Sequence, residues 1–350
     1  MIIYILAALL PLCVVSNYNK LPMCLQTVNR RNSYLFWTLA VLFLIIGFRH
    51  ESMGTDTIGY LEDFYRFSNL DWKLAIEDTR QEPGFVIFTK VVGLLTNSAE
   101  VYQLVYTLLY FVCYYQFLKQ FDGNLPFYFL FFFVTLGEFM FFFTGVRQCI
   151  AISLCLFSFK YILEKKWYYF AFIILIAYHI HHSVVLFGIV YLMANLKVTK
   201  FNMSLYLVIM YFASKYLVSA QMYLNEKLEY NYEIEQADSG MIFLMLISIL
   251  SFFSYIYVVK NNLSNKLIGV LFNVNIITLF FWLLRLQTRV AERPSFYFLP
   301  FSCVLFAYLI KNTRVQILRF GFIAVPFIYY IYRFYTTFRL FNPYRTFLFE

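Results

Sequence analysis

Residues 125–163 read LPFYFLFFFVTLGEFMFFFTGVRQCIAISLCLFSFKYIL. The stretch is almost wholly apolar, and its only charged residues are Glu138, Arg147 and Lys160. Runs such as Phe139 to Phe143 do not alternate between apolar and polar, as the strands of a membrane β-barrel would. The stretch therefore predicts two long apolar helices, residues 125–143 and 146–163, of the kind that cross membranes.

The composition of the whole chain agrees with this prediction. Of its 350 residues, 62% are hydrophobic, 23% are aromatic and 13% are charged. A soluble domain is about a quarter charged, so this chain has too few charges to cover the surface of a soluble globule. The composition excludes a soluble enzyme and a disordered chain. It predicts an all-α, polytopic integral membrane protein with a single transmembrane domain over residues 1–350.

The apolar runs predict about twelve transmembrane helices. We expect them near residues 1–16, 34–48, 100–118, 125–143, 146–163, 167–180, 183–196, 203–222, 241–259, 267–284, 295–310 and 318–338. Several are shorter than the roughly 20 residues that cross a bilayer squarely. The run 84–97 is also apolar but short, and we expect an interfacial or re-entrant helix there.

The charge distribution predicts the orientation of these helices. The net charge is +9, and cytoplasmic loops of membrane proteins carry excess Lys and Arg. Five breaks between apolar runs are basic: Lys20/Arg30/Arg31, Lys160/Lys165/Lys166, Lys197/Lys200, Lys260/Lys266 and Lys311/Arg314/Arg319. With twelve crossings and both chain ends outside, all five fall in the cytoplasm. The acid-rich segments 49–82 and 223–240 then form outer loops.

Other functions have little support in the sequence. No basic stretch is long enough for a nucleic-acid arm, and the six scattered Cys suggest neither a disulfide frame nor a zinc site. The chain has no Walker loop, no dinucleotide fingerprint and no metalloprotease motif. It shows no inverted repeat of the kind found in transporters. We expect no metal, no nucleotide and no other cofactor.

Several unusual polar residues fall on the predicted outer face. Gly54-Thr55-Asp56-Thr57 predicts a turn that starts a helix, with Asp56 or Thr57 as an ordinary N-cap. Arg147 opens a helix, where a cation opposes the macrodipole, so it either reaches the lipid headgroups or helps to form an anion site. Glu138, about six residues inside the end of its helix, should face the interior and pair, with Arg147 as one candidate. A buried ion pair without chemistry is the alternative for Glu138.

The histidines and a late arginine cluster complete the predicted outer face. His179 and His182 are three residues apart and could share a helical face, but no third metal ligand is visible, so a proton acceptor is the more plausible role. His179 and His181 could equally be structural turn residues. Arg285, Arg289 and Arg293 would form one helical stripe about 12 Å long. Either Glu292 and a diphosphate compensate this stripe, or it is a solvated helix end in contact with headgroups.

The order of these motifs resembles a known family. It runs R-x4-G-T-D-T-x2-Y (49–60), E-P-G-F (82–85), G-V-R-Q (145–148), A-x-H-x-H-H-S (177–183), the arginine cluster and N-P-Y (342–344). Over nearly the whole chain this pattern resembles the EpsG-type branch of Wzy polysaccharide polymerases.

The resemblance implies a GT-C-like glycosyltransferase of the bacterial inner membrane. Its active site would face the periplasm or the cell exterior, where it would join repeat units of O-antigen, capsule or exopolysaccharide. The donor and the acceptor would be glycans linked to undecaprenyl diphosphate, which is the leaving group. Membrane lipid and a separate chain-length regulator are further candidate partners.

The resemblance and the residues together give a set of candidate site residues. The candidates for the acid–base residue are His182, Asp56 and Glu138, in that order, because an imidazole accepts protons near neutral pH. His182→Ala is expected to abolish polymer and His181→Ala to be milder. The substrate-binding candidates are Arg49, Thr55, Tyr60, Glu82, Arg147, Gln148, Arg285, Arg289, Arg293 and Tyr344. A flippase of lipid-linked oligosaccharides, another transporter, and a related ligase or acyl-modifying enzyme are the alternatives.

Overall fold

The computed structural model describes residues 1–77, 79, 81–228, 240–262, 264–338 and 341–349. Its elements are helices, and over these ranges the only β-type pairing is an isolated bridge between Arg49 and Thr346. The predicted all-α class is confirmed. Most of the expected outer loop 223–240, namely residues 229–239, lies outside the described residues.

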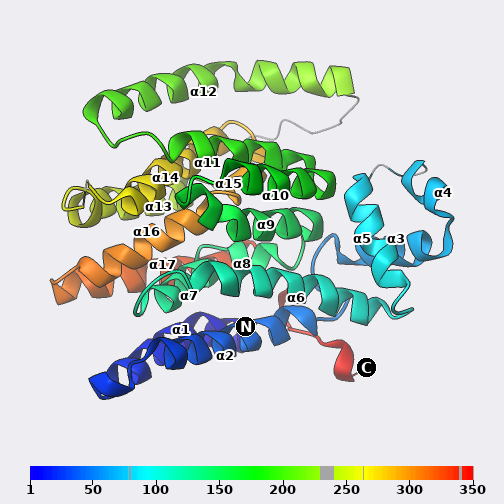
Figure 1. The fold of residues 1–350 in the computed structure, drawn as a ribbon, viewed down its shortest axis with the longest axis horizontal. Helices are drawn as coiled ribbons and strands as arrows, with labels where there is room; N and C mark the ends of the chain where they lie inside the picture. The colour runs from blue at the N-terminus through cyan, green and yellow to red at the C-terminus, as the bar shows by residue number, and fades with distance from the viewer. Residues whose placement is uncertain (78, 80, 229–239, 263, 339–340, 350) are drawn as a thin grey trace. The chain divides into compact units, whose positions relative to one another are not determined.

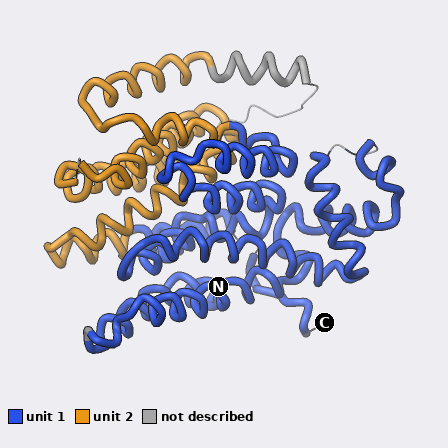
Figure 2. Tube along the Cα trace, in the orientation of Figure 1, with its two compact units in different colours: residues 1–185, 326–350 blue, residues 186–325 orange. Residues whose placement is uncertain are grey.

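The chain divides into two compact units, shown in Figure 2. Unit 1 holds residues 1–185 and 326–350, and unit 2 holds residues 186–325. The expected single transmembrane domain stays a prediction.

Unit 1 carries the N-terminal helices (Figure 1). They are α1 (Ile2–Lys20), α2 (Val28–Gly47), α3 (Thr57–Asn69), α4 (Trp72–Glu77), α5 (Pro83–Gly93), α6 (Ala99–Leu118), α7 (Leu125–Thr135), α8 (Glu138–Phe141), α9 (Val146–Leu163) and α10 (Trp167–Ile180). Helix α9 packs against both α6 and α10, and α5 packs against α3 and α10. These contacts bring segments that are distant in sequence to the first turn of α5.

Unit 2 holds most of the remaining helices. They are α11 (Gly188–Met193), α12 (Lys200–Leu228), α13 (Met241–Ser254) with the π-helical turn Tyr255–Val259, α14 (Lys266–Arg285), α15 (Glu292–Ser295) and α16 (Leu299–Asn312). The 3-10 helix His182–Phe187 and α17 (Gln316–Thr336) each cross the boundary between the units. Each of the twelve predicted apolar runs contains helix, although the run 125–143 is divided between two helices.

By length and composition, fewer helices qualify as membrane spans than the twelve that the sequence predicts. Within the described ranges, six helices qualify as candidate spans: Ile2–Lys20, Ala99–Leu118, Val146–Leu163, Met241–Val259, Lys266–Arg285 and Gln316–Thr336. A pair bent by 65°, Arg289–Ser295 with Leu299–Asn312, would make a seventh. Several other apolar helices are too short, so the predicted count of about twelve is not confirmed.

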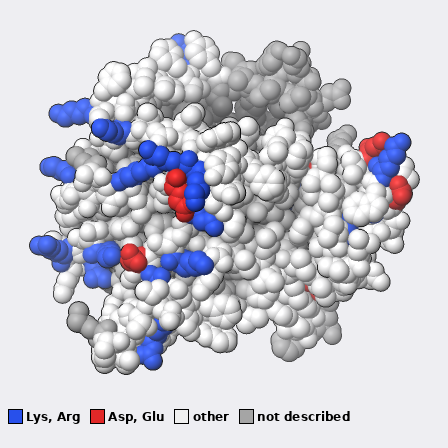
Figure 3. Space-filling view, viewed as in Figure 1, with Lys and Arg blue, Asp and Glu red and all other residues white. Residues whose placement is uncertain are grey.

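The exposed surface nevertheless suits a lipid environment. Helix α10 alone exposes Trp167, Phe172 and Leu175, each by more than half of its surface. Figure 3 shows that uncharged residues cover most of one face of the molecule. Because exposed large apolar side chains are costly in water, the apolar helices are those of a membrane protein.

The predicted helix 125–143 is wrong in its second half. Helix α7 ends at Thr135, and Gly137 adopts a left-handed conformation with a φ of 94°. Glycine takes this conformation without a steric penalty, so the chain turns there and restarts as the four-residue helix α8. Glu138 therefore begins a short helix and does not lie inside a long one.

A column of buried tyrosines forms the centre of unit 1. Tyr102, Tyr106, Tyr110 and Tyr114 recur at every fourth residue of α6, and all are fully buried. Residues four apart lie on one face of a helix, which explains the column. Buried phenols need hydrogen-bond partners, and these four contact in turn the Thr89 hydroxyl, the Arg49 guanidinium, the Val146 carbonyl and the Glu138 carboxylate.

Candidate functional site

Three of the sequence motifs meet at the carboxylate of Glu82. This residue occupies the N-cap position of α5 and is only 7% exposed. One carboxylate oxygen, Oε2, forms an ion pair with the Arg147 guanidinium. The other, Oε1, lies 3.0 Å from Nδ1 of His181 and accepts the backbone N–H of His182 at 3.3 Å. The E-P-G-F, G-V-R-Q and H-x-H-H segments are thus joined by a single side chain.

The rest of the E-P-G-F segment explains how Glu82 is held. Pro83 fits the first turn of α5, where no backbone donor is needed. A Cβ on Gly84 would lie 2.7 Å from the carbonyl oxygen of His179, so only glycine allows α5 to approach α10 this closely. Phe85 is fully buried, with its ring 5.7 Å from the ring of Tyr60 and 6.0 Å from the Arg147 guanidinium carbon. Close packing therefore fixes the carboxylate in place.

The surroundings of Glu82 keep it ionised. Burial alone would raise the pKa of Glu82, but the hydrogen bond from His181 and the charge of Arg147 outweigh burial and lower that pKa to about 2. The Tyr60 hydroxyl also hydrogen-bonds with Arg147. At neutral pH the charge of Arg147 is therefore already balanced by Glu82.

A second carboxylate lies beside this group. Asp63 on α3 accepts a hydrogen bond of 2.8 Å from the side-chain amide of Gln81. Burial raises the pKa of Asp63, while the Gln81 hydrogen bond and the charges of Arg66 and Arg147 act against the rise. Sequence reasoning did not identify Asp63 or Gln81, because both lie in the segment 49–82, which carries many acids without a distinguishing spacing.

The structure separates the three histidines. Helix α10 ends at Ile180, and His181 has an extended backbone with a φ of −157°. His179 and His182, which the spacing allowed to share a helical face, therefore do not lie on one helix. The exposed His182 ring lies 4.7 Å from the ring of Tyr178. Across the described part of the chain, no group of three His, Cys, Asp or Glu could hold a metal ion.

His181 is the histidine whose side chain enters the site. Its Nδ1 contacts Glu82, its side chain is 22% exposed, and no described residue bonds its Nε2. The sequence alone did not distinguish it from its neighbours. His181 is the C-cap of α10, and because a cap residue leaves the helix direction, only the structure shows which histidine faces Glu82.

The G-T-D-T segment forms a structural turn. Gly54 has a φ of 105° and packs so closely on the Phe143 carbonyl that any Cβ would overlap it. Thr57 donates to that carbonyl at 3.0 Å and to the Met53 carbonyl at 2.9 Å. These contacts attach the loop to the break before α9. Asp56 occupies the predicted N-cap position of α3 but makes no side-chain cap hydrogen bond, and Thr55 donates to it at 3.0 Å.

Arg49 lies in the interior and is fully buried. It donates to the Ile46 carbonyl at 2.7 Å and to the Tyr106 hydroxyl at 2.9 Å, and its guanidinium faces the Tyr106 and Phe143 rings. Tyr344 of the N-P-Y segment donates to the Ile45 carbonyl at 3.0 Å. The structure thus places Arg49 and Tyr344 near one another at the end of α2.

The predicted pairing of Glu138 with Arg147 is wrong. The carboxylate of Glu138 is fully buried and accepts a hydrogen bond from Tyr114, whereas Arg147 pairs with Glu82. The second oxygen of Glu138 is buried without a partner among the described residues. Gln148, next to Arg147, is also buried. Glu138 therefore belongs to the tyrosine column and not to the group formed by Glu82, Arg147 and His181.

In unit 2, the predicted arginine stripe is interrupted. Helix α14 ends at Arg285, and Thr288 is extended, with a φ of −148° and a ψ of 131°. Arg289 then begins a 3-10 turn and Arg293 lies in α15, so the three do not share one helical face. The predicted neutralisation by Glu292 is confirmed for Arg285, whose Nε lies 2.8 Å from Oε2 of Glu292.

Comparison with known proteins identifies the family of this chain. The sequence profile of the EpsG family matches residues 33–346, which includes every motif described above. Neither the curated proteins nor the solved structures contain a match. Because the match covers most of an all-helical chain rich in apolar helices, the chain belongs to the EpsG family of polysaccharide polymerases.

Proposed function

We propose that this protein is a membrane glycosyltransferase that joins lipid-linked oligosaccharide repeat units into a polysaccharide. The units would be linked to undecaprenyl diphosphate, and the reaction would occur at the outer face of the bacterial inner membrane. The product would be an O-antigen, a capsule or an exopolysaccharide. Membership of the EpsG family and the apolar helices support the general class.

The contact between Glu82 and His181 is the observation that carries this proposal. An ionised carboxylate against Nδ1 holds a proton on that nitrogen and leaves Nε2 as the proton acceptor. Such a pair is the ordinary arrangement of a general base and the group that orients it. The sequence placed His182 first among the bases, but the geometry favours His181, because its side chain is the one that contacts Glu82.

The proposed reaction step is a displacement at the donor sugar. A hydroxyl oxygen of the acceptor attacks the anomeric carbon of the donor, and the bond between that carbon and the diphosphate oxygen breaks. The hydroxyl proton moves to Nε2 of His181, and Glu82 stabilises the resulting imidazolium. The lipid diphosphate leaves with the electron pair of the broken bond. A base in this role contributes on the order of 10²–10⁴ in rate.

The developing charge on the diphosphate needs cationic partners. Arg147 is largely neutralised by Glu82, so it attracts an anion less strongly than its sequence position suggests. The segment Arg285–Arg293 carries three Arg against Glu292, a net charge of +2. We keep these arginines as the predicted ligands of the diphosphate, since the guanidinium fork matches phosphate oxygens.

Comparison of histidine variants tests the proposal. Purified protein in lipid nanodiscs is supplied with synthetic lipid-diphosphate-linked repeat units, and polymer ladders are measured by gel. We expect His181→Ala to lower the polymerisation rate at least 100-fold, within the range for a lost general base. His179→Ala and His182→Ala should retain most of the wild-type rate. Full activity of His181→Ala at a matched protein level would remove the residue from this role.

The same assay separates the alternatives. A ligase would give single transfer to a different acceptor and no ladder. A flippase or another transporter would give no new glycosidic bond with any variant. Addition of a purified chain-length regulator would change the length of the ladder and not its presence.

A further inference from the structure

Glu138 is a buried carboxyl group that the proposed reaction does not use. Its side chain is fully buried, and it begins α8 directly after the left-handed Gly137. Its Oε1 accepts a hydrogen bond from Tyr114, whereas its Oε2 has no hydrogen-bond partner among the described residues. Within the described ranges, no Lys, Arg or His nitrogen forms an ion pair with it. A single hydroxyl group is therefore its whole polar environment there.

Aromatic rings fill the space around this carboxyl group. The Tyr114 ring, whose hydroxyl contacts Glu138, lies 5.1 Å from the ring of Phe133 and 5.4 Å from that of Phe142. The Phe133 ring packs in turn on Phe139 at 5.9 Å, and all three phenylalanines are fully buried. Such surroundings do not replace the water that an ionised carboxylate loses on burial.

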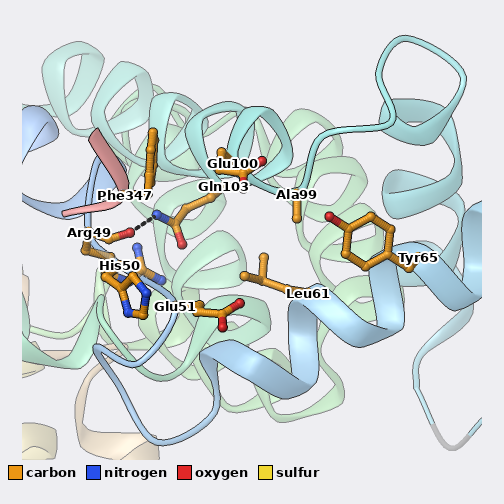
Figure 4. A pocket seen from close by; sticks show the side chains of 9 residues that line it. All are labelled: Arg49, His50, Glu51, Leu61, Tyr65, Ala99, Glu100, Gln103 and Phe347. Carbon is orange, nitrogen blue, oxygen red and sulfur yellow. Dashed lines mark hydrogen bonds between the residues drawn. The ribbon is translucent and has the colours of Figure 1, made fainter. Parts of the chain in front are cut away.

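The buried cation of the tyrosine column is too far along α6 to compensate a charge on Glu138. Figure 4 shows Arg49 at the start of α6, and its guanidinium donates to Tyr106. Tyr106 and Tyr114 are two turns apart, or about 12 Å along the helix axis. Tyr110, which lies between them, donates to a backbone carbonyl of α9.

The titratable groups of the other neighbouring helices have partners of their own. On α9, Arg147 pairs with Glu82, and the thiol of Cys149 contacts a backbone carbonyl at 3.7 Å. On α17, Arg333 donates to a tyrosine of its own helix at 2.9 Å, and the Tyr330 hydroxyl lies 3.9 Å from a methionine sulfur of α8. Tyr4 of α1 donates to a backbone carbonyl at 2.9 Å.

We propose that Glu138 carries a proton in the folded protein, and that this neutral carboxyl group is a structural component of the break between α7 and α9. A neutral acid still offers Oε1 as the acceptor for Tyr114. Burial of an unpaired charge costs far more than burial of a neutral hydroxyl group, so the folded protein retains the proton. A structural proton of this kind is independent of the proposed polymerisation.

The proton makes this break sensitive to pH. The Phe143 carbonyl, within the break, accepts the hydrogen bond from Thr57, and Gly145 at its end is the N-cap of the helix that carries Arg147. Ionisation of Glu138 would draw water toward the break, because the surrounding rings do not solvate a charge. Loss of the proton therefore loosens the segment that holds the Gly54–Thr57 turn and the start of α9.

Infrared spectroscopy tests the proton directly. The full chain in lipid nanodiscs is measured in D₂O at neutral pH, where ordinary carboxyl groups are ionised. We expect the carbonyl-stretch band of a protonated carboxyl group, absent from Glu138→Gln and retained in Glu100→Gln, an exposed carboxyl group on α6. Tyr114→Phe should keep the band and shift it to higher frequency, because the carbonyl oxygen loses its hydrogen bond.

The pH dependence of unfolding in detergent supplies a second measurement. An unfolded glutamate ionises above about pH 4.3, so from about pH 5 to 7 the folded protein holds a proton that the unfolded chain releases. The unfolding equilibrium constant of the wild type should therefore rise tenfold per pH unit relative to that of Glu138→Gln.

Four results would overturn the structural proton. They are the absence of the band from the wild type, an equal band in Glu138→Gln, an unshifted band in Tyr114→Phe, and the same pH dependence of unfolding in the wild type and Glu138→Gln. The Tyr114→Phe spectrum decides the question even where Glu138→Gln does not fold.

Discussion

Glu82→Gln removes the negative charge that Arg147 and His181 share, while it leaves an oxygen that can still accept a hydrogen bond. In the folded protein the pKa of Glu82 is lowered from 4.5 to about 2. This shift corresponds to roughly 3 kcal/mol in favour of the ionised form. The variant therefore loses a strong interaction with both partners. Each lost charge-assisted contact is worth roughly 1.5–3 kcal/mol, so we expect polymer formation to slow by at least tenfold and by about 100-fold if the imidazolium forms in the transition state.

The assay compares Glu82→Gln with Glu77→Gln, an exposed carboxylate on α4. Ladder formation is measured in nanodiscs at equal amounts of folded protein, and thermal unfolding is measured in parallel. Since the folded-state pKa is lowered, Glu82 stabilises the fold above about pH 4.5, and this stabilisation is lost as the pH falls toward 2. Glu82→Gln should lack that acid-dependent loss. Wild-type rates in Glu82→Gln, with an unchanged pH dependence of unfolding, would refute the role of this carboxylate.

Three further predictions follow from packing, charge and topology. Gly84→Ala places a Cβ against the α10 backbone and should lower the free energy of unfolding by about 1–3 kcal/mol. Gly59→Ala, with open space around its Cβ, is the control and should not lower it. Equal unfolding temperatures of the two variants would contradict the close approach of α5 to α10. Arg289→Lys and Arg293→Lys should lower the polymerisation rate about ten- to 100-fold, because Lys lacks the bidentate fork, and near wild-type rates in both would exclude them as diphosphate ligands. Lys165→Cys in a Cys-depleted chain should react with a membrane-impermeant thiol reagent only from the cytoplasmic side, and labelling from outside would reverse the topology.

The positions of the helices could be predicted from the sequence because apolar runs are a local signal. The interruptions within these apolar runs could not be predicted from the sequence. Gly137 stops a helix in a run where every neighbour favours continuation, and Thr288 becomes extended between two arginines that a continuous helix would have aligned. A glycine permits a left-handed turn without requiring one, so the sequence alone does not show that the helix stops at Gly137.

The candidate site could be predicted only in part. The motif order brought Glu82 and Arg147 onto the list of candidates, but the sequence offered Arg147 only as one candidate partner of Glu138 and did not pair it with Glu82. Nothing in the sequence shows that a left-handed glycine directs Glu138 toward the tyrosine column. Likewise, the choice between His181 and His182 depends on the backbone direction after the last turn of α10, which spacing alone does not determine.

The discontinuity of unit 1 has a consequence for the order in which the chain is made. The Tyr4 hydroxyl binds the Phe341 carbonyl, 337 residues later, and the bridge between Arg49 and Thr346 closes the end of α2. The ribosome must therefore complete residues 186–325 before unit 1 can finish folding. Until then, Tyr4 and Arg49 lack these two late partners, and a chain stopped before residue 341 never acquires them. The slowest stage of biogenesis should be this late closure of early helices by residues made last.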